Sequence, residues 1–292
     1  MVSAGEVPDF LLRWVADDIV ARLAVVKRTF GTVLNLGAHN GVVGQAVQNL
    51  YPDAFVIHAD HAQAMLTHCA GSCLVADEEA LPFRDASVDL VVSGLSLQFV
   101  NDLPGALAQI RRALKPDGLF VGAMPGGATL HELRDVLTQA EIEIFGGVSP
   151  RVAPFADVRD LGGLLQRAGF ALPVADADIV NVTYATAFDL MRELRAMGAG
   201  NVLVERRRTP ATRSFFVRAA EIYGERFATD EGRIQATFEI MTMTGWAPDP
   251  SQQQPLKPGS ASARLADALG TTEQPAGETV GSGVSARNTE KL

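Results

Sequence analysis

A glycine-bearing turn in the first fifth of the chain contains the residues with the clearest chemical meaning. Residues 33–44, VLNLGAHNGVVG, open with an apolar run that predicts a buried strand at 33–36, and a helix is predicted at 41–50. Gly37 and Gly41 lie in the turn, with His39 between them. Such a turn lets backbone N–H groups approach a cofactor closely, so we expect a nucleotide-type cofactor here.

Two cofactor classes compete for a turn of this kind. The dinucleotide pattern G-x-G-x-x-G, begun at Gly37, needs glycine at His39 and at Val42, so it fails twice. The S-adenosylmethionine pattern is an acidic residue followed by x-G-x-G-x-G. It puts the acid at Asn35 and the middle glycine at His39, whereas Gly37 and Gly41 match. The second pattern fits better, and the alternative is a turn that binds nothing.

Acidic residues follow two further predicted strands. Asp60 follows a strand at 54–59, and Asp77 with Glu78 follows a strand at 72–76. A carboxylate at the first place can bond both ribose hydroxyls, and one at the second can accept from the adenine amino group. These acids suit the nucleoside end of either cofactor. The antiparallel last strand predicted at 234–244 favours S-adenosylmethionine.

His39 has three interpretations. Its side chain points outward, lines the cofactor pocket, or obstructs the cofactor. We favour a pocket-lining His39, because Ala38 and Gly41 beside it keep the turn narrow.

The elements around this turn alternate between strands and helices. Further strands are predicted at 88–93, 119–123 and 179–184, and helices in the first 30 residues and at 103–114, 130–144, 158–168, 188–197 and 211–227. Apolar strands that alternate with helices indicate a parallel sheet covered on both faces. The predicted fold is α/β, a doubly wound, seven-stranded, mostly parallel sheet. A small helical cap, at about 186–230, is inserted before the last antiparallel strand.

Composition restricts the class of protein further. The net charge is −9, and an acidic chain without a basic stripe is a poor nucleic-acid binder; the basic run at 206–208 indicates a solvated segment. Two cysteines, Cys69 and Cys73, indicate a reducing compartment and do not complete a zinc site, so no metal is predicted. We see neither a transmembrane run nor a signal peptide, and we expect a cytoplasmic protein.

The C-terminal segment differs from the rest of the chain. Residues 249–292 are rich in Pro, Gly, Ser, Thr, Ala and Gln and contain no aromatic residue. Such a segment buries too little apolar area to offset the cost of ordering it. We therefore predict one domain at 1–248 and a disordered tail at 249–292.

Several phrases resemble a known family. They are LPFRDASVDLVVSGLSLQFVNDLPGALAQIRRALKPDGLFVGAMPGGATLHELR at 81–134, GGVSPRVAPFADVRDLGGLLQRAGF at 146–170, RELRAMGAGN at 192–201 and ATFEIMTMTGW at 236–246. They resemble the respiratory complex I assembly factors that act as arginine hydroxylases, and more distantly the malonyl-acyl-carrier-protein O-methyltransferases of biotin synthesis. The resemblance implies a class I methyltransferase fold, which is Rossmann-like, with S-adenosylmethionine as cofactor.

The resemblance also implies positions for the cofactor site. Together with the pocket-lining His39, the predicted cofactor residues are Gly37, Ala38, Gly41, Asp60, Asp77, Glu78, Ser93 and Leu95. The chain departs from the family at three positions. His39 replaces a glycine, Asn35 replaces an acid, and Phe99 stands where Trp is expected. From the position of the first predicted helix, we also expect no N-terminal arm rich in basic and aromatic residues.

The chemistry expected of such a site places few demands on the protein. Methyl transfer from a sulfonium is mainly alignment of a nucleophile, so no catalytic residue is assigned. Hydroxylation usually needs iron held by two His and one carboxylate. The local candidate is the segment HADH with His58, Asp60 and His61, in which His58 and Asp60 form an H-x-D pair, but a ribose role for Asp60 is favoured. Candidate substrate residues come from the loops after the strands: Gln98, Met124, Thr129, His131, Arg134, Phe155, Tyr184 and Trp246.

Three functions follow from the sequence. The first is an S-adenosylmethionine-binding enzyme that hydroxylates or methylates a protein side chain in complex I assembly. The second is a conventional methyltransferase on a small molecule or acyl carrier. The third is a non-catalytic assembly chaperone that retains the fold, an interpretation that depends on His39 and Asn35. We expect a protein or small-molecule partner and no nucleic acid.

Overall fold

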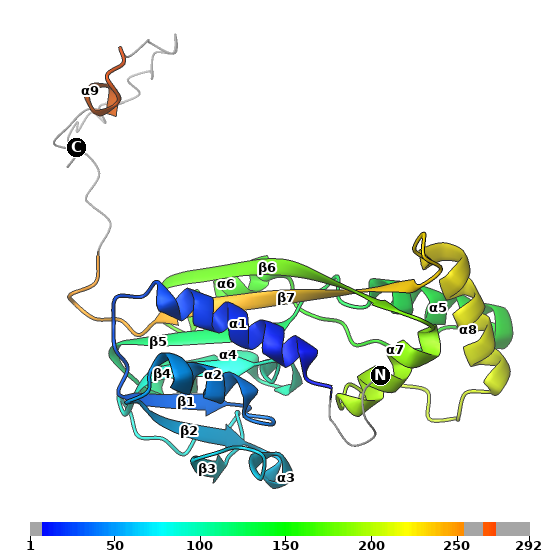
Figure 1. Ribbon diagram of the computed structural model, residues 1–292, viewed down its shortest axis with the longest axis horizontal. Coiled ribbons are helices and arrows are strands. Elements are labelled where there is room, and N and C mark those ends of the chain that lie inside the picture. The colour runs from blue at the N-terminus through cyan, green and yellow to red at the C-terminus, as the bar shows by residue number, and fades with distance from the viewer. Residues whose placement is uncertain (1–7, 254–264, 273–292) are drawn as a thin grey trace, which may run out of the picture. The chain divides into compact units, whose positions relative to one another are not determined.

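A seven-stranded sheet forms the centre of the computed structural model, which describes residues 8–253 and 265–272. The strand order is β3-β2-β1-β4-β5-β7-β6 (Figure 1). The first five strands are parallel, and β7 runs antiparallel to both β5 and β6. The strands are β1 (Thr32–Leu36), β2 (Phe55–Asp60), β3 (Ser72–Val75), β4 (Val88–Gly94), β5 (Leu114–Pro125), β6 (Ala171–Tyr184) and β7 (Ile234–Trp246). The predicted fold class is confirmed.

Helices cover both faces of this sheet (Figure 1). One apolar core packs β1, β4 and β5 against α1 (Phe10–Ala24), α2 (Val42–Leu50), α5 (His131–Phe145), α7 (Ala187–Ala196) and α8 (Arg213–Phe227). The opposite core packs the sheet against α4 (Leu103–Ala113) and α6 (Val158–Arg167). Because both faces are buried, the central strands are almost entirely apolar, which is the pattern that made them predictable.

The strand order reverses between β1 and β4, and this reversal positions the site. β2 and β3 lie on one side of β1, whereas β4, β5 and the last two strands lie on the other. The chain leaves β1 and β4 in opposite directions at their carboxyl ends, which opens a crevice where doubly wound sheets bind ligands. Short elements frame this edge, namely α3 (Gln63–Leu66) and a 3-10 turn at Leu97–Phe99, neither of which was predicted.

The cap helices lie where the sequence predicted them, because α7 and α8 are inserted between β6 and β7. The strand before them is longer than expected. β6 begins at Ala171 rather than at residue 179, and its outer half alternates between half-buried and exposed residues. Asp176 and Asp178 interrupt the apolar pattern there, and Asp176 is held by Arg22 of α1 at 2.6 Å. This part of β6 was not predicted because its residues alternate between half-buried and exposed positions and include acidic side chains.

The C-terminal segment is a separate unit, because the chain divides between Pro250 and Ser251. Within it the structure describes a short helix, α9 (Leu265–Leu269). The disorder of the tail at 249–292 stays a prediction. Its segments 254–264 and 273–292 lie outside the described residues. No helix in the described part of the chain is both long and apolar enough to cross a membrane.

Candidate functional site

The turn after β1 brings backbone into the crevice at three residues with positive φ. Gly37 has φ +64°, His39 +49° and Gly41 +84°. A Cβ on Gly37 would lie 2.1 Å from Ser96 Cβ, so only glycine allows the loop after β4 to pass this closely. His39 adopts the left-handed conformation that glycine usually occupies, and its backbone N–H donates to Asp60 Oδ2 at 2.8 Å. The missing glycine is thus accommodated without loss of the turn.

The acids that follow the strands gather beside this turn. Asp60 ends β2, and its second oxygen, Oδ1, accepts from the backbone N–H of Ala62 at 2.7 Å. Glu78 Oε1 accepts from Ser96 Oγ at 2.5 Å. Asp77 Oδ1 accepts from the backbone N–H of Glu79 at 2.8 Å. Carboxylates from two separate strand ends therefore face the same crevice, as predicted.

These groups line a cleft of about 500 Å³. That volume lies in the range of small-molecule and cofactor sites. The lining residues are His39, Asp60, His61, Ala62, Met65, Asp77, Glu78, Glu79, Ser96, Phe99, Val100, Ala196, Met197 and Gly198. The last three come from the end of α7 and the turn after it, so the cap closes one side of the cleft.

The cleft is negatively charged. Four of its residues are carboxylates: Asp60, Asp77, Glu78 and Glu79. Within residues 8–253 and 265–272, each of them accepts from neutral donors, and none forms a salt bridge with Lys or Arg. A cleft lined by charges of one sign concentrates ligands of the opposite sign. This cleft favours a cationic or hydroxyl-rich ligand.

The other side of the turn is packed. Asn35 and His58 are buried on neighbouring strands, with Asn35 Nδ2 lying 3.2 Å from His58 Nδ1. A Cβ on Gly44 of α2 would lie 2.4 Å from His58 Cε1 and 2.7 Å from Asn35 Nδ2. Burial lowers the pKa of His58, although its bond to Ala70 opposes this shift. The Asn35 that replaces an acid is thus the partner of a neutral, buried histidine.

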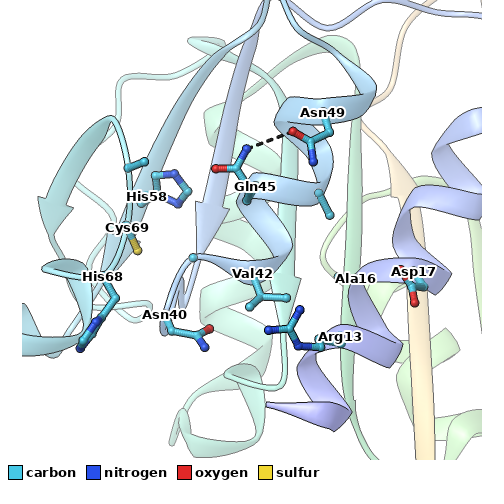
Figure 2. Close-up of a pocket in the computed structure, with 13 residues that line it drawn as sticks. Arg13, Ala16, Asp17, Asn40, Val42, Gln45, Asn49, His58, His68 and Cys69 are labelled. Carbon is cyan, nitrogen blue, oxygen red and sulfur yellow. Dashed lines mark hydrogen bonds between the residues drawn. The ribbon is translucent and has the colours of Figure 1, made fainter. Parts of the chain in front are cut away.

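A second cavity, of about 470 Å³, opens beside this packed side (Figure 2). Residues of α1, of the start of α2 and of the segment before β3 line it, among them Arg13, Asn40 and His68. His58 reaches its wall, pairs with Asn35 and does not line the acidic cleft. No group of three or more His, Cys, Asp or Glu residues in the described ranges has a metal-holding arrangement.

The predicted cofactor residues divide between these two sides. His39, Asp60, Asp77 and Glu78 line the acidic cleft, and Gly37 lies directly beneath Ser96. Leu95 contributes its carbonyl oxygen, which lies 3.3 Å from His39 Nε2. Gly37 and Leu95 are not themselves among the cleft-lining residues, and neither are the remaining three. Ala38 and Ser93 are buried, and Gly41 lines the second cavity.

Of the predicted substrate residues, Gln98 lies nearest the cleft. Its Nε2 donates to Leu95 O at 2.6 Å, the same carbonyl that His39 contacts. Its Oε1 is buried and has no hydrogen-bond partner among the described residues. Phe155 is half-buried beside Ala156, which pairs with Gly126 in the loop after β5.

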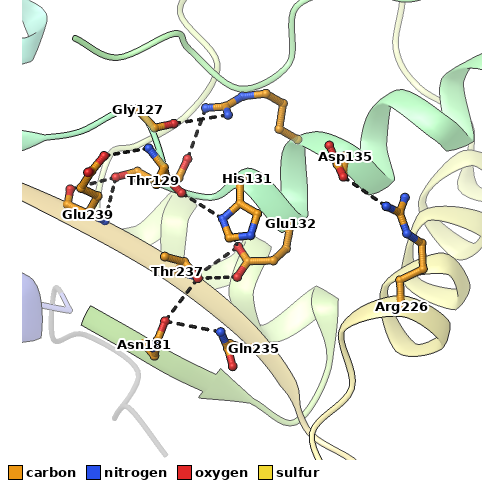
Figure 3. A network of polar contacts seen from close by, with 12 residues as sticks. Gly127, Thr129, His131, Glu132, Asp135, Asn181, Arg226, Gln235, Thr237 and Glu239 are labelled. Carbon is orange, nitrogen blue, oxygen red and sulfur yellow. Dashed lines mark hydrogen bonds and ion pairs between the residues drawn. The ribbon is translucent and has the colours of Figure 1, made fainter. Parts of the chain in front are cut away.

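Three further substrate candidates form a structural network instead (Figure 3). Thr129 is buried and donates to the backbone oxygen of Glu239 at 2.9 Å. Arg134 Nη2 donates to Thr129 O at 3.3 Å, and His131 Nδ1 lies 3.5 Å from the buried carboxylate of Glu132. These contacts fasten the loop after β5 to β7. None of the three residues lines the acidic cleft.

The last three substrate predictions are wrong in their placement. Met124 and Tyr184 are buried in the two cores, and burial raises the pKa of the Tyr184 hydroxyl. Trp246 ends β7 and pairs with Leu119 at the start of the regular part of β5. Because β7 is antiparallel, its last residue lies at the sheet edge opposite the cleft.

Sequence reasoning also missed several lining residues. Ala62 and Met65 follow Asp60, as does His61, which was considered only as a metal ligand, so the rule that ligands bind after parallel strands was sufficient to find them. Ser96 lies two residues beyond β4 and follows from the same rule. The end of α7 carries no such signal, because only the tertiary fold brings Met197 to the cleft.

Together, the strand order, the antiparallel β7 and the acid-lined crevice beside the β1 turn define a class I S-adenosylmethionine-dependent methyltransferase fold. Residues 34–122 match the methyltransferase domain family. S-adenosylmethionine is the cofactor of that domain, in agreement with the sequence prediction. The YcgJ protein of Bacillus subtilis shares this fold, with a TM-score of 0.55 at 15% identity over 81% of this chain and 99% of that one.

Curated relatives define the family more closely. The mitochondrial arginine hydroxylase NDUFAF5 of Danio rerio is 40% identical over 264 residues, covering 89% of this chain and 82% of the relative. A malonyl-[acyl-carrier protein] O-methyltransferase of Xylella fastidiosa is 35% identical over 224 residues, covering 74% of each. The chain belongs to the family of the NDUFAF5 arginine hydroxylases.

Proposed function

We propose that the chain binds S-adenosylmethionine in the acidic cleft and modifies an arginine side chain of a protein in respiratory complex I assembly. The 40% sequence identity to the arginine hydroxylase of Danio rerio supports arginine as the side chain that is modified. The observation that carries the proposal is the group of four cleft carboxylates, none paired with Lys or Arg in the described ranges. Cytoplasmic localisation stays a prediction.

The residues present fit the adenosine part of the cofactor. Asp60 has lone pairs left for ribose hydroxyls after accepting two backbone N–H bonds at 2.8 and 2.7 Å. Asp77 is exposed at the cleft and can accept from the adenine amino group. Met65, Phe99 and Val100 supply apolar surface for a flat ring.

The methionine part of the cofactor would pass over Gly37, where a Cβ would clash with Ser96. When bound, S-adenosylmethionine supplies an activated methyl group on a sulfonium centre. The task left to the protein is to orient the substrate side chain and to exclude water.

The charge of the cleft favours arginine over a malonyl group. A guanidinium is cationic at neutral pH, and the cleft carboxylates attract it. A malonyl carboxylate carries the same sign as Glu78 and Glu79, the two cleft carboxylates not assigned to the adenosine, and is repelled. The acyl-carrier reaction of the 35%-identical relatives is therefore the second candidate, and the test below includes it.

Mass spectrometry tests this proposal. The purified full chain is incubated in air with S-adenosylmethionine and either an arginine-containing complex I subunit or malonyl-acyl-carrier protein, with and without a two-electron reductant, because addition of oxygen from dioxygen consumes two electrons and releases water. We expect a mass gain on an arginine of the subunit that is lost with Asp60→Asn, and its size separates addition of oxygen from addition of methyl. A methyl ester on the acyl carrier would favour the second candidate. No change on either substrate would favour a non-catalytic assembly protein.

A further inference from the structure

The backbone of His39 is held in a conformation that a side chain rarely adopts. Its φ of +49° lies in the left-handed region. Two contacts fix it: the backbone N–H donates to Asp60 Oδ2 at 2.8 Å, and Nε2 lies 3.3 Å from Leu95 O. Residues in such conformations persist only where the surroundings over-determine them, and they concentrate at functional sites. His39 is therefore a feature of the cleft that needs its own explanation.

The side chain of His39 crosses the crevice. His39 follows β1 and Leu95 follows β4, and these are the two strands between which the sheet order reverses. A ligand that enters a doubly wound sheet at its switch point lies between the two loops that these residues occupy. The imidazole and the Leu95 carbonyl therefore join the two walls of the crevice at the place a ligand would use.

A second contact closes the crevice one step further along the chain. Ser96 Oγ donates to Glu78 Oε1 at 2.5 Å. The two side chains meet directly above Gly37, since a Cβ there would lie 2.1 Å from Ser96 Oγ and 3.2 Å from Glu78 Oε1. Glu78 follows β3 and Ser96 follows β4, so this bond also joins opposite sides of the crevice.

The His39 contact can open without leaving a buried polar atom unpaired. Leu95 O also accepts from Gln98 Nε2 at 2.6 Å, so the carbonyl keeps a partner when His39 leaves. His39 and Glu78 are only half-buried, so water can solvate the released groups. Ser96 is buried, so a ligand that opens its bond to Glu78 must supply a new partner for the hydroxyl.

We propose that His39 with Leu95, and Ser96 with Glu78, form a latch that joins the two walls of the switch-point crevice beside Gly37 and that the cofactor displaces on binding. The proposal rests on the proposed function, because it assumes that S-adenosylmethionine is the ligand. The latch lowers the fraction of protein competent to bind, and the apparent dissociation constant rises in proportion. His39 is thus a positioning residue that tunes cofactor affinity.

Calorimetric titration of the full chain with S-adenosylmethionine tests the latch. His39→Ala removes the imidazole. His39→Gly also removes it, and because glycine readily adopts a positive φ, this variant keeps the turn if alanine distorts it. His68→Ala is the control, because His68 is exposed and lies outside the acidic cleft. We expect both His39 variants to bind roughly three- to ten-fold more tightly than wild type and the control to be unchanged.

The possible outcomes separate the latch from the proposed function. Wild-type binding with His39 variants of equal or weaker affinity would overturn the latch and leave the cofactor proposal standing. Binding by the His39 variants with little or none by wild type would support both. Absence of binding by every protein at millimolar ligand would overturn the cofactor proposal and the latch together. Ser96→Ala gives an independent check, with tighter binding expected when the bond to Glu78 is lost.

Discussion

The two sides of the turn after β1 are built on different principles. Beneath it, Asn35, His58 and Gly44 are buried and so close that no atom can be added. Above it, His39 and Glu78 are half-buried and make bonds that water or a ligand can replace. The packed side holds the turn in place, whereas the contacts on the side of the acidic cleft can be exchanged for others. The two departures from the S-adenosylmethionine pattern, Asn35 and His39, therefore have different causes.

This difference changes what each departure implies for function. Asn35 replaces an acid because its amide pairs with a neutral His58 in the core. It bears on folding and gives no reason to doubt cofactor binding. His39 replaces a glycine within the cleft itself and faces the ligand path. Variants on the packed side of the turn should therefore alter the stability of the fold, and variants on the cleft side should alter the affinity for the cofactor.

The largest stability effect is expected from Gly44→Ala. Its new Cβ would lie 2.4 Å from His58 Cε1 and 2.7 Å from Asn35 Nδ2, both in a packed core. We expect a loss of about 2–3 kcal/mol in the free energy of unfolding, measured by denaturant titration. Gly163→Ala in α6 is the matched control, because a Cβ there has no neighbour within 4 Å. Equal stability of the two variants would show that the lower side is not tightly packed.

Next in size is Asn35→Leu. The change removes the amide that lies 3.2 Å from His58 Nδ1 and leaves a buried ring nitrogen unpaired. The expected loss is about 1–3 kcal/mol in the free energy of unfolding, read from the same titration. Cofactor affinity, by contrast, should change by less than about two-fold. A selective loss of cofactor affinity with unchanged stability would place Asn35 in the cofactor site and contradict its assignment to the packed side of the turn.

His58 should also give the protein a pH-dependent stability. Burial lowers its pKa below the ordinary 6.5, so the unfolded chain takes up this proton at a higher pH than the folded one. The stability from neutral His58 is complete above pH 6.5 and declines as pH falls below it. We expect the melting temperature of His58→Gln to fall less than that of wild type between about pH 7.5 and about pH 5.5. His68→Gln should keep the wild-type slope, and a wild-type slope in His58→Gln would contradict a neutral His58.

The smallest stability effect is expected above the turn, from Ser96→Ala. Glu78 loses the hydroxyl that donates to it at 2.5 Å but remains half-buried at the cleft, where water can replace the bond. The free energy of unfolding should fall by less than about 1 kcal/mol, as measured by denaturant titration. A loss as large as that of Gly44→Ala would mean that this contact is part of the core after all.

The difference between the packed side and the cleft side of the turn also explains which features could be predicted from the sequence. The strands around the turn were predictable because they are buried on both faces, and Asp60 and Asp77 were found because parallel strands deliver their carboxyl ends to one edge. The direction of the His39 side chain was not predictable, since it depends on Leu95, more than fifty residues along the chain. Trp246 was misplaced because the sheet partner of an antiparallel strand end cannot be identified from its own composition.

The central claim is that Asp60 holds S-adenosylmethionine in the acidic cleft, and one titration tests it most directly. Calorimetry of wild type and Asp60→Asn should show saturable binding to wild type and affinity at least about ten-fold weaker in the variant, which loses the charge and one of the two oxygens that accept from the backbone N–H groups of His39 and Ala62. Asp53→Asn, at an exposed position outside the cleft, should bind as wild type does. Equal affinity of wild type and Asp60→Asn, or no binding by either wild type or the His39 variants at millimolar ligand, would contradict the account.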